Sequence, residues 1–270
     1  MSGLLPLTGR ELKKWYRNPV AFIVSLVQPF FWIALFGSAF DIAKLSFHGI
    51  DVGSALFQGA PDYITFILGG VLTITTLFTA MFSGVNIIWD RRMGPLSRFL
   101  SAPIRRSSIV FSKIISGTVR GLVQVAILII AALLIPDGLV LRHGFTVVDA
   151  LIIAAAVVLV SFSFSSIFSI IAVRMTRMET IFGIVNLVNL PLMFASYALF
   201  PPGLMAGWLS RVAQYNPVSW SALSIRTVLL NGSLTGAQLS SVAHYLLYLT
   251  VLAIVMVLLT IFVSERGIRE

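Results

Sequence analysis

The sequence predicts an all-α polytopic membrane protein with six transmembrane helices. Composition is the first reason: 58% of the 270 residues are hydrophobic and 11% are charged, whereas soluble domains carry about a quarter charged residues. The second reason is that the hydrophobic residues form long runs, because about 20 apolar residues in a helix cross a bilayer with every backbone hydrogen bond made internally. We therefore expect residues 1–270 to form one transmembrane domain.

Residues 1–19 are expected to form an amphipathic helix before the first span. Thr8 followed by Glu11 matches the capping-box pattern of a helix start, and Asn18-Pro19 stops the helix. One face carries the larger apolar side chains Leu12, Trp15 and Tyr16. Basic side chains take the other faces, so this interfacial helix would lie in the headgroup layer. A specific contact with a cytoplasmic partner is the alternative.

Six apolar runs follow, and each is long enough to cross a bilayer. They cover residues 20–40, 62–88, 114–135, 149–173, 181–200 and 243–263. Residues 201–232, between the fifth run and the sixth, are only moderately apolar and contain two Pro-containing breaks, FPPG and YNPV. This segment is therefore not counted as a span.

The basic residues indicate how the chain is oriented. Six spans place both termini on the same side, and that side holds 15 of the 19 Lys and Arg residues with five of the ten acidic residues, a net charge of +10. The opposite side has four basic and five acidic residues, a net charge of −1. Because cytoplasmic loops carry the excess of Lys and Arg, both termini are expected in the cytoplasm and the chain in the cell membrane. The net charge of +9 is then a topology signal, and no nucleic-acid partner is expected.

The sequence holds no recognisable catalytic or metal site. The dipeptide Gly-Lys is absent, so a phosphate-binding loop of the Gly-x-x-x-x-Gly-Lys-Ser/Thr kind is excluded. The histidines lie in unrelated segments without metal-ligand spacing: His48, His143 and His244. Intramembrane proteases share the span count, but the chain lacks Gly-x-Ser-Gly. The four-residue spacing of Ser161, Ser165 and Ser169 favours close helix packing, so no metal, cofactor or enzymatic activity is expected in this chain.

The acidic residues are placed where they cannot drive ion-coupled transport. Ion-driven transporters keep carboxylates near the bilayer midplane. Here the acids closest to the spans mark their ends: Asp62, Asp90, Asp149 and Glu179. If the protein moves solutes uphill, the driving force must come from another polypeptide through the cytoplasmic face.

The stretch from Arg91 to Lys113 concentrates six basic side chains between two apolar runs. Gly94-Pro95 can start a short helix, which Ala102-Pro103 would end. An apolar stripe would run along this helix: Leu96, Phe99 and Leu100. A short helix with such a stripe and a basic rim suits a groove of a soluble protein. A loop that holds topology and anionic lipid explains the charge equally well, so the residues alone leave both readings open.

Polar residues inside the spans are candidates for a transport pathway, because each would cost free energy if it faced lipid. One side of the second span carries Thr65, Gly69, Thr73, Thr76 and Ser83, and one side of the fifth carries Asn186 and Asn189. Helix packing alone is the alternative for every one of them.

Two stretches resemble type-2 ABC exporter permeases, most closely the daunorubicin-resistance and nodulation-factor branch. The run WDRRMGPLSRFLSAPIRRSSIVFSKII is similar to the cytoplasmic loop of that family. The matching positions are Asp90, Arg91, Gly94, Leu96, Leu100, Pro103, Arg105, Arg106 and Lys113. The run FPPGLMAGWLSRVAQYNPVSWSALSIRTVLLNG is similar to the region before its last span, with matches at Asn216, Pro217, Arg226 and Gly232. Two departures are Arg92, where the family has Glu, and Ser112-Lys113, where it has Gly-Lys.

The resemblance implies a coupling helix that docks on a separate ATPase, which would bind ATP and Mg²⁺. Its residues here would be Arg91, Gly94, Leu96, Arg98, Phe99, Leu100, Pro103, Arg105 and Arg106. It also implies a pathway between two permease chains, a homodimer or a pair of close relatives. The segment 201–232 would form short re-entrant helices that enter the membrane from outside.

The cargo is expected to be amphipathic, drug-like or lipid-like, and to be moved outward. The 20 Phe residues outnumber the 11 Trp and Tyr residues, whereas stacking against sugar rings would favour Trp and Tyr. A polysaccharide or glycolipid exporter is the alternative within transport. An intramembrane enzyme and a passive channel or scaffold are the alternatives outside it.

Overall fold

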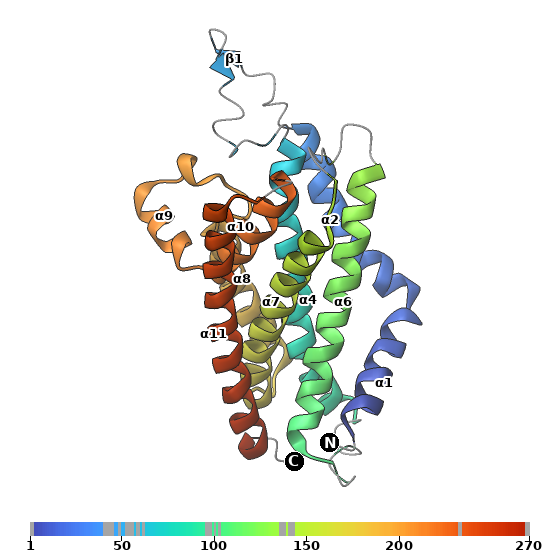
Figure 1. Cartoon of the computed structure of the whole chain (residues 1–270). Coiled ribbons are helices and arrows are strands. Elements are labelled where there is room, and N and C mark those ends of the chain that lie inside the picture. The colour runs from blue at the N-terminus through green and yellow to red at the C-terminus, as the bar shows by residue number, and fades with distance from the viewer. Residues whose placement is uncertain are drawn as a thin grey trace.

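The computed structural model describes residues 3–39, 46–47, 50–51, 57, 60, 63–94, 99, 101, 104–134, 139, 144–231 and 234–267. It is a long bundle of helices (Figure 1), which confirms the all-α polytopic class. The strands it describes are the antiparallel pair β1 (Ser46–Phe47) and β2 (Ile50–Asp51).

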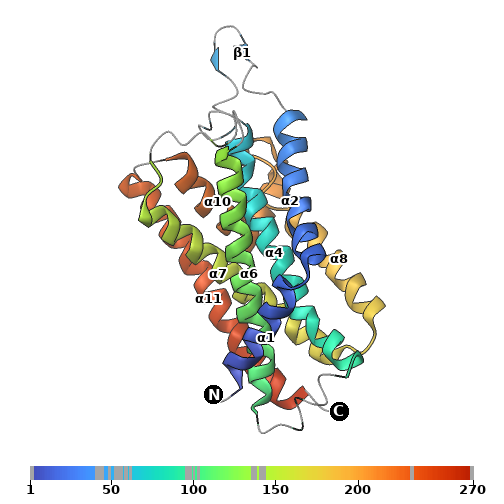
Figure 2. The same cartoon turned by 90° about the vertical axis from the view of Figure 1, so that its right-hand side faces the viewer.

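The helices follow the apolar runs of the sequence. In chain order they are α1 (Leu4–Tyr16), α2 (Pro19–Ala39), α4 (Tyr63–Arg92), α6 (Arg106–Leu134), α7 (Val147–Arg174), α8 (Met178–Phe194), α9 (Gly207–Gln214), α10 (Pro217–Leu230) and α11 (Gly236–Gly267), with a 3-10 turn η2 at Pro202–Leu204. The N-terminus and the C-terminus lie at the same end of the bundle in both views (Figures 1 and 2). We call this the basal end and the opposite one the distal end.

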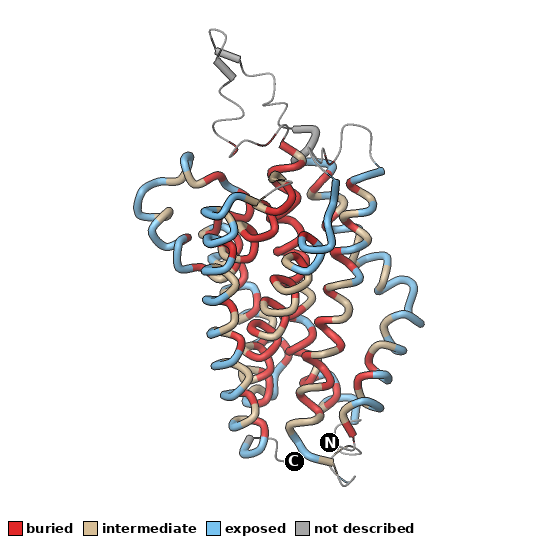
Figure 3. Tube along the Cα trace, in the orientation of Figure 1, coloured by how far each residue is buried: buried red, intermediate tan, exposed pale blue. Residues whose placement is uncertain are grey.

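Helix α4 forms the centre of the bundle and packs against α2, α6, α7 and α10. Its most apolar stretch is 83% buried within the chain, whereas that of α11 is only 17% buried. The buried residues accordingly concentrate along the middle of the molecule (Figure 3). The outer side of α11 is a row of exposed apolar residues, including Leu247, Val251 and Leu258, as expected of a helix that faces lipid.

Small residues let α4 and α7 approach closely. A Cβ placed on Gly84 of α4 would come within 2.6 Å of the backbone oxygen of Ser165 on α7. The hydroxyl of Ser165 donates to the backbone oxygen of Ala80 at 2.9 Å. Ser161 and Ser169 are also fully buried. The packing interpretation of the serine row is therefore confirmed.

Four or five spans, fewer than the six predicted, meet the criteria of length and composition among the described residues. Among the described residues, α4, α6, α7 and α11 are each long and apolar enough to cross a membrane. Helices α1 and α2 pass the same test only as a pair bent by 76°, which would make a fifth span if the pair crosses the membrane once. The predicted fifth span is shorter than residues 181–200, because α8 ends at Phe194. Its 17 residues cover about 26 Å at the rise of an α-helix, less than the ~30 Å hydrocarbon core.

The segment after α8 forms the short helices expected of residues 201–232. The turn η2 begins in FPPG, and α10 begins at Pro217 of YNPV. Helices α9 and α10 lie in the distal half of the bundle (Figure 1), and α10 packs against α4, α7 and α11. Re-entry of this segment into the membrane stays a prediction.

Candidate functional site

At the basal end, α4 is tied to the end of α7 by Arg91. Its Nη1 donates to the backbone oxygen of Met175 at 2.8 Å, and its Nη2 donates to that of Val173 at 3.1 Å. Helix α4 ends at Arg92, and Gly94 follows with a φ of +87°, a left-handed conformation that glycine adopts without strain. Arg91 therefore anchors the helix end from which the basic connection to α6 departs.

The described part of that connection packs against α1. The guanidinium carbon of Arg10 lies 4.9 Å from the centre of the Phe99 ring. A Cβ on Gly3 would come within 2.6 Å of Cγ2 of Ile104. Arg92, Arg105 and Arg106 are exposed. The other predicted coupling residues, Leu96, Arg98, Leu100 and Pro103, lie outside the described residues, so docking on an ATPase stays a prediction.

A buried ion cluster joins three helices next to this connection. Lys113 of α6 donates from Nζ to Oε1 of Glu11 on α1 at 3.0 Å and to Oδ2 of Asp90 on α4. Lys113, Glu11 and Asp90 are 2%, 7% and 3% exposed. Nη1 of Arg10 also donates to Glu11 at 3.0 Å. We call these four side chains the basal ion cluster; two positive and two negative charges make it neutral.

The basal ion cluster holds α1 against the bundle. Removing one partner of a buried ion pair typically costs about 3–5 kcal/mol, because the other charge is left without compensation. Sequence reasoning missed this cluster, although two signals were present. Glu11 lies four residues after Leu7 and four before Trp15, so it shares their face of α1, and Lys113 lies among apolar residues in the first half of α6. A charge on an apolar helix face indicates a buried counter-charge.

Helix α1 is amphipathic as predicted, but its start is not where the sequence pattern placed it. The helix begins at Leu4, so Thr8 and Glu11 lie inside it. The hydroxyl of Thr8 donates to the backbone oxygen of Leu4 at 2.9 Å, while the Glu11 carboxylate binds Lys113. The capping-box prediction is therefore wrong, because Thr8 is not at the helix start and the Glu11 carboxylate binds Lys113 instead of a backbone N–H.

Only part of the predicted apolar face of α1 packs against the bundle, and the rest is exposed. Leu12 and Trp15 are partly buried, whereas Tyr16 is 62% exposed. The Trp15 ring meets the Phe22 ring edge-on at 5.1 Å. Asn18 ends α1 and starts α2, since its Oδ1 accepts from the backbone N–H of Ala21 at 3.1 Å.

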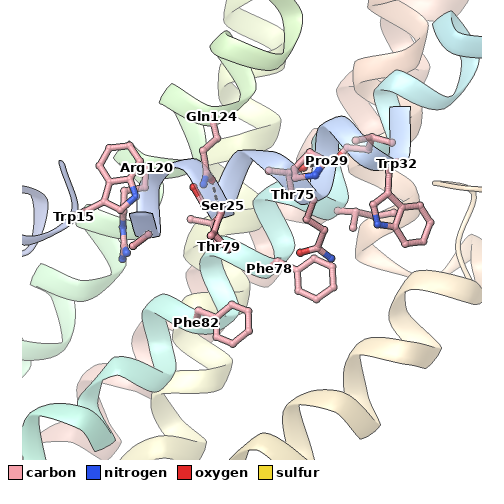
Figure 4. A pocket seen from close by; sticks show the side chains of 15 residues that line it. Trp15, Ser25, Pro29, Trp32, Thr75, Phe78, Thr79, Phe82, Arg120 and Gln124 are labelled. Atoms are coloured by element: carbon pink, nitrogen blue, oxygen red, sulfur yellow. Dashed lines mark hydrogen bonds between the residues drawn. The ribbon is translucent and has the colours of Figure 1, made fainter. Parts of the chain in front are cut away.

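A groove of about 400 Å³ lies between α2, α4 and α6. Figure 4 shows Trp15 and Arg120 at one end of it and Pro29 and Trp32 at the other. Phe78 of α4 lies along the wall. Uncharged polar side chains from all three helices also line the groove: Ser25, Gln28, Thr75, Thr79 and Gln124. Thr79 donates from its hydroxyl to Oε1 of Gln124 at 2.6 Å.

The predicted pathway residues of α4 do not line this groove. Thr65, Thr73, Thr76 and Ser83 are all fully or almost fully buried inside the bundle. The Thr73 hydroxyl lies 3.1 Å from that of Ser221 on α10, and Gly69 faces the backbone of Arg226. The groove instead takes Thr75 and Thr79, which are one helical turn apart and which sequence reasoning passed over.

The two predicted pathway residues of α8 differ from each other. Asn189 is buried, and its Oδ1 has no hydrogen-bond partner among the described residues. Asn186 is exposed beside Leu187, Leu190 and Phe194, which are also exposed. A pathway role for these residues, as for those of α4, stays a prediction.

At the distal end, Asn216 links α8 to α10. Its Oδ1 accepts from the backbone N–H of Val218 at 2.9 Å, which caps α10 ahead of Pro217. Its Nδ2 donates to the backbone oxygens of Leu192 at 2.9 Å and Ala195 at 2.7 Å. This Asn-Pro pair therefore sets the angle between α8 and α10.

Arg226 links the same segment to α4. It is 1% exposed, and its guanidinium carbon lies 3.8 Å from the centre of the Phe66 ring. Nε donates to the backbone oxygen of Phe66 at 3.0 Å, and Nη2 donates to those of Tyr197 at 2.9 Å and Ala198 at 3.0 Å. Both Asn216 and Arg226 are thus surrounded by backbone groups, and Gly232 lies outside the described residues.

The family model described as "ABC-2 type transporter" matches residues 4–230. The "Putative transport permease ycf38" of Porphyra purpurea is 30% identical over 226 residues, which are 83% of this chain and 73% of that protein. The "Daunorubicin resistance ABC transporter permease protein DrrB1" of Streptomyces coeruleorubidus is 24% identical over 230 residues, 85% of this chain and 75% of that one. The "Probable doxorubicin resistance ABC transporter permease protein DrrC" of Mycobacterium tuberculosis is 23% identical over 226 residues, 83% and 76%.

Proposed function

Because this chain belongs to the ABC-2 type transporter family, we propose that it is the permease subunit of an exporter driven by a separate ATPase subunit. One observation carries the proposal: the basic connection between α4 and α6 packs against α1 beside an ion cluster that joins all three helices. A displacement of this connection by a partner would move α1, α4 and α6 as one unit, in the way that packed helices shift as rigid bodies.

In this proposal the basal end faces the cytoplasm of the cell that carries the protein in its membrane. The distribution of basic residues supports this orientation, because 15 of the 19 Lys and Arg residues belong to the side that holds both termini. The helix α1 would then lie in the inner headgroup layer, with the exposed side chains of Lys13, Lys14 and Arg17 near anionic lipid.

The ATPase subunit would bind ATP and Mg²⁺ and would dock on the coupling residues of the connection. The permease would supply the apolar stripe of Leu96, Phe99 and Leu100, with the rim formed by Arg98, Arg105 and Arg106. The absence of Gly-Lys from the sequence supports this division of labour. The permease would itself perform no hydrolysis.

A second permease chain would cover α8. The exposed face of this helix carries Leu187, Leu190 and Phe194 around the exposed amide of Asn186. An amide facing lipid loses its hydrogen bonds with water and gains none, so a protein partner or a polar pathway is the more favourable neighbour. The pathway would then follow this interface.

The cargo would be amphipathic, drug-like or lipid-like, and would leave the cell. The groove between α2, α4 and α6 has the volume of a small-molecule site, about 400 Å³, and combines aromatic with uncharged polar side chains. The names of the Streptomyces and Mycobacterium relatives, which refer to drug resistance, agree with such a cargo. This volume favours a compact amphipath over a polysaccharide.

Flux into inside-out vesicles tests the proposal. The chain is reconstituted with a candidate ABC ATPase, and the uptake of a fluorescent amphipath is followed with and without ATP. Uptake that needs ATP and both subunits is expected. ATP-independent uphill uptake by the permease alone would refute the proposal. So would labelling of a Ser101→Cys variant from the outer face, a clean measurement because the chain has no other Cys.

A further inference from the structure

One side chain of the groove carries a charge. Among the described residues that line it, Arg120 is the charged one, and the other polar members are uncharged. Figure 4 places its guanidinium beside Trp15, at the α1 end of the groove. Arg120 belongs to α6, which is long and apolar enough to cross the membrane.

Only two of the three guanidinium nitrogens of Arg120 donate hydrogen bonds to described residues. Nε donates to the backbone oxygen of Ser116 at 3.2 Å, and Nη2 donates to the hydroxyl of Ser83 at 3.0 Å. Among the residues that the structure describes, Nη1 has no acceptor and no carboxylate forms an ion pair with Arg120; the Glu11 carboxylate attracts the guanidinium only through space. The carboxylates of the basal ion cluster are bound by Lys113 instead.

An arginine in an apolar wall calls for a counter-charge. A cation removed from water is costly unless an anion and hydrogen bonds compensate it. Guanidinium matches carboxylate and phosphate in charge and in donor geometry. The Nη1 group and the open groove thus suit an anionic ligand that binds the guanidinium directly, which no carboxylate among the described residues does.

The remainder of the groove suits an apolar body. Beyond Arg120 the walls carry Phe78 of α4 and then Pro29 and Trp32 of α2. A ligand with an anionic head at Arg120 would therefore have its tail directed along α2 towards Trp32. Gln124 and Thr79, which bind one another, lie where the head meets the tail.

We infer that the groove binds an anionic amphipath, with a carboxylate or phosphate head on Arg120 and an apolar body towards Trp32. The inference rests on the proposed function and names its substrate class. Arg120 is then the residue that selects anionic cargo over neutral or cationic cargo of the same shape.

The test measures binding to the full chain in nanodiscs of neutral phosphatidylcholine, without an ATPase. The probes are dansyl-labelled undecanoic acid, its methyl ester, and the ammonium analogue with the same chain. Energy transfer from the tryptophans, of which Trp15 and Trp32 line the groove, reports binding. The acid should bind about tenfold more tightly than the ester, the effect of one charge-assisted hydrogen bond, and the ammonium probe should bind least.

Variants separate recognition from structure. Arg120→Gln should lower the affinity for the acid to that for the ester and leave the ester unchanged, while Arg120→Lys should retain most of the preference. Lys14→Gln, on the exposed side of α1, controls for attraction by surface charge and should change nothing. Equal binding of acid and ester by the unaltered chain overturns the inference, and so does a loss of both probes in Arg120→Gln.

A second copy of the chain in the groove would also overturn the inference. In that case neither probe binds, and Ser25→Cys, whose side chain lines the groove, forms a disulfide-linked dimer. The proposed function fails separately. Acid-selective binding without ATP-dependent flux would support this inference and refute the proposed exporter function. ATP-dependent flux of neutral amphipaths alone would support the exporter function and refute this inference.

Discussion

Replacing Lys113 with Met should detach α1 from the bundle. The change keeps the length of an apolar stem but removes the cation between Glu11 and Asp90, whose side chains are 7% and 3% exposed. Two carboxylates are then buried, and among the described residues Arg10 is the cation still hydrogen-bonded to one of them. Breaking a buried pair costs about 3–5 kcal/mol, a large part of the stability of a typical domain, ~5–15 kcal/mol.

The measurement is equilibrium unfolding in mixed micelles, followed by tryptophan fluorescence, since Trp15 lies in α1 against Phe22. The matched variant is Glu11→Gln/Asp90→Asn/Lys113→Met, which removes the three buried charges of the cluster together. It should recover most of the lost stability, because replacing the buried ions of such a group together is often close to neutral and the remaining charge, on Arg10, is 40% exposed. Lys14→Met, on the exposed side of the same helix, should change stability by less than about 0.5 kcal/mol.

Two outcomes would refute this reasoning. Unfolding of Lys113→Met at the same denaturant concentration as the unaltered chain would show that the ion cluster contributes nothing. A triple variant as unstable as the single one would show that the loss comes from packing of the lysine stem, because charge removal would then have no compensating effect.

Three further predictions concern other parts of the molecule. Gly84→Ala should lower the free energy of unfolding by about 1–3 kcal/mol, because a Cβ there would meet the backbone of α7 at 2.6 Å. The control is Gly183→Ala, which has open space around it. In the same assay it should be neutral or stabilising by up to ~1 kcal/mol. The double variant Leu96→Asp/Phe99→Asp should abolish co-purification of the ATPase, because charge replaces the apolar stripe of the proposed docking helix. Asn216→Ala should cost about 2 kcal/mol in unfolding, since a helix cap and two donated hydrogen bonds are lost, whereas Asn216→Asp should keep the cap and lose only the donations.

Each of these has an outcome that contradicts it. Equal unfolding of the two glycine variants would mean that α4 and α7 separate without cost. Retained co-purification with loss of flux would assign the stripe to signalling rather than docking. Identical stability of the alanine and aspartate variants at Asn216 would remove the capping contribution.

The helices were largely predictable from the sequence. Residues 149–173 agree with α7 (Val147–Arg174) within two residues at each end, because the apolar run there ends at polar residues that also end the helix. Residues 114–135 missed the start of α6, which begins at Arg106. The predicted run begins just after Lys113, but the helix begins before it, because Glu11 and Asp90 neutralise the buried lysine.

The candidate site was only partly predictable. The connection between α4 and α6 was identified from its charge, and the distal segment from its Pro-containing breaks. The groove was missed, since its walls come from α2, α4 and α6 and each helix contributes only two polar side chains to it. No single stretch of sequence contains the pattern, so only the packing of three helices brings Arg120, Thr79 and Ser25 to one surface.

The sequence by itself determined that this chain is a helical membrane protein and which runs of residues form its long helices. The physical reason is that the bilayer acts on each residue through its own polarity, so composition and periodicity carry the information locally. The tertiary structure decided which polar side chains meet. Lys113 and Glu11 are separated by 102 positions, and their pairing depends on how α1 bends back onto α6, which is set by side-chain packing between helices rather than by any local pattern.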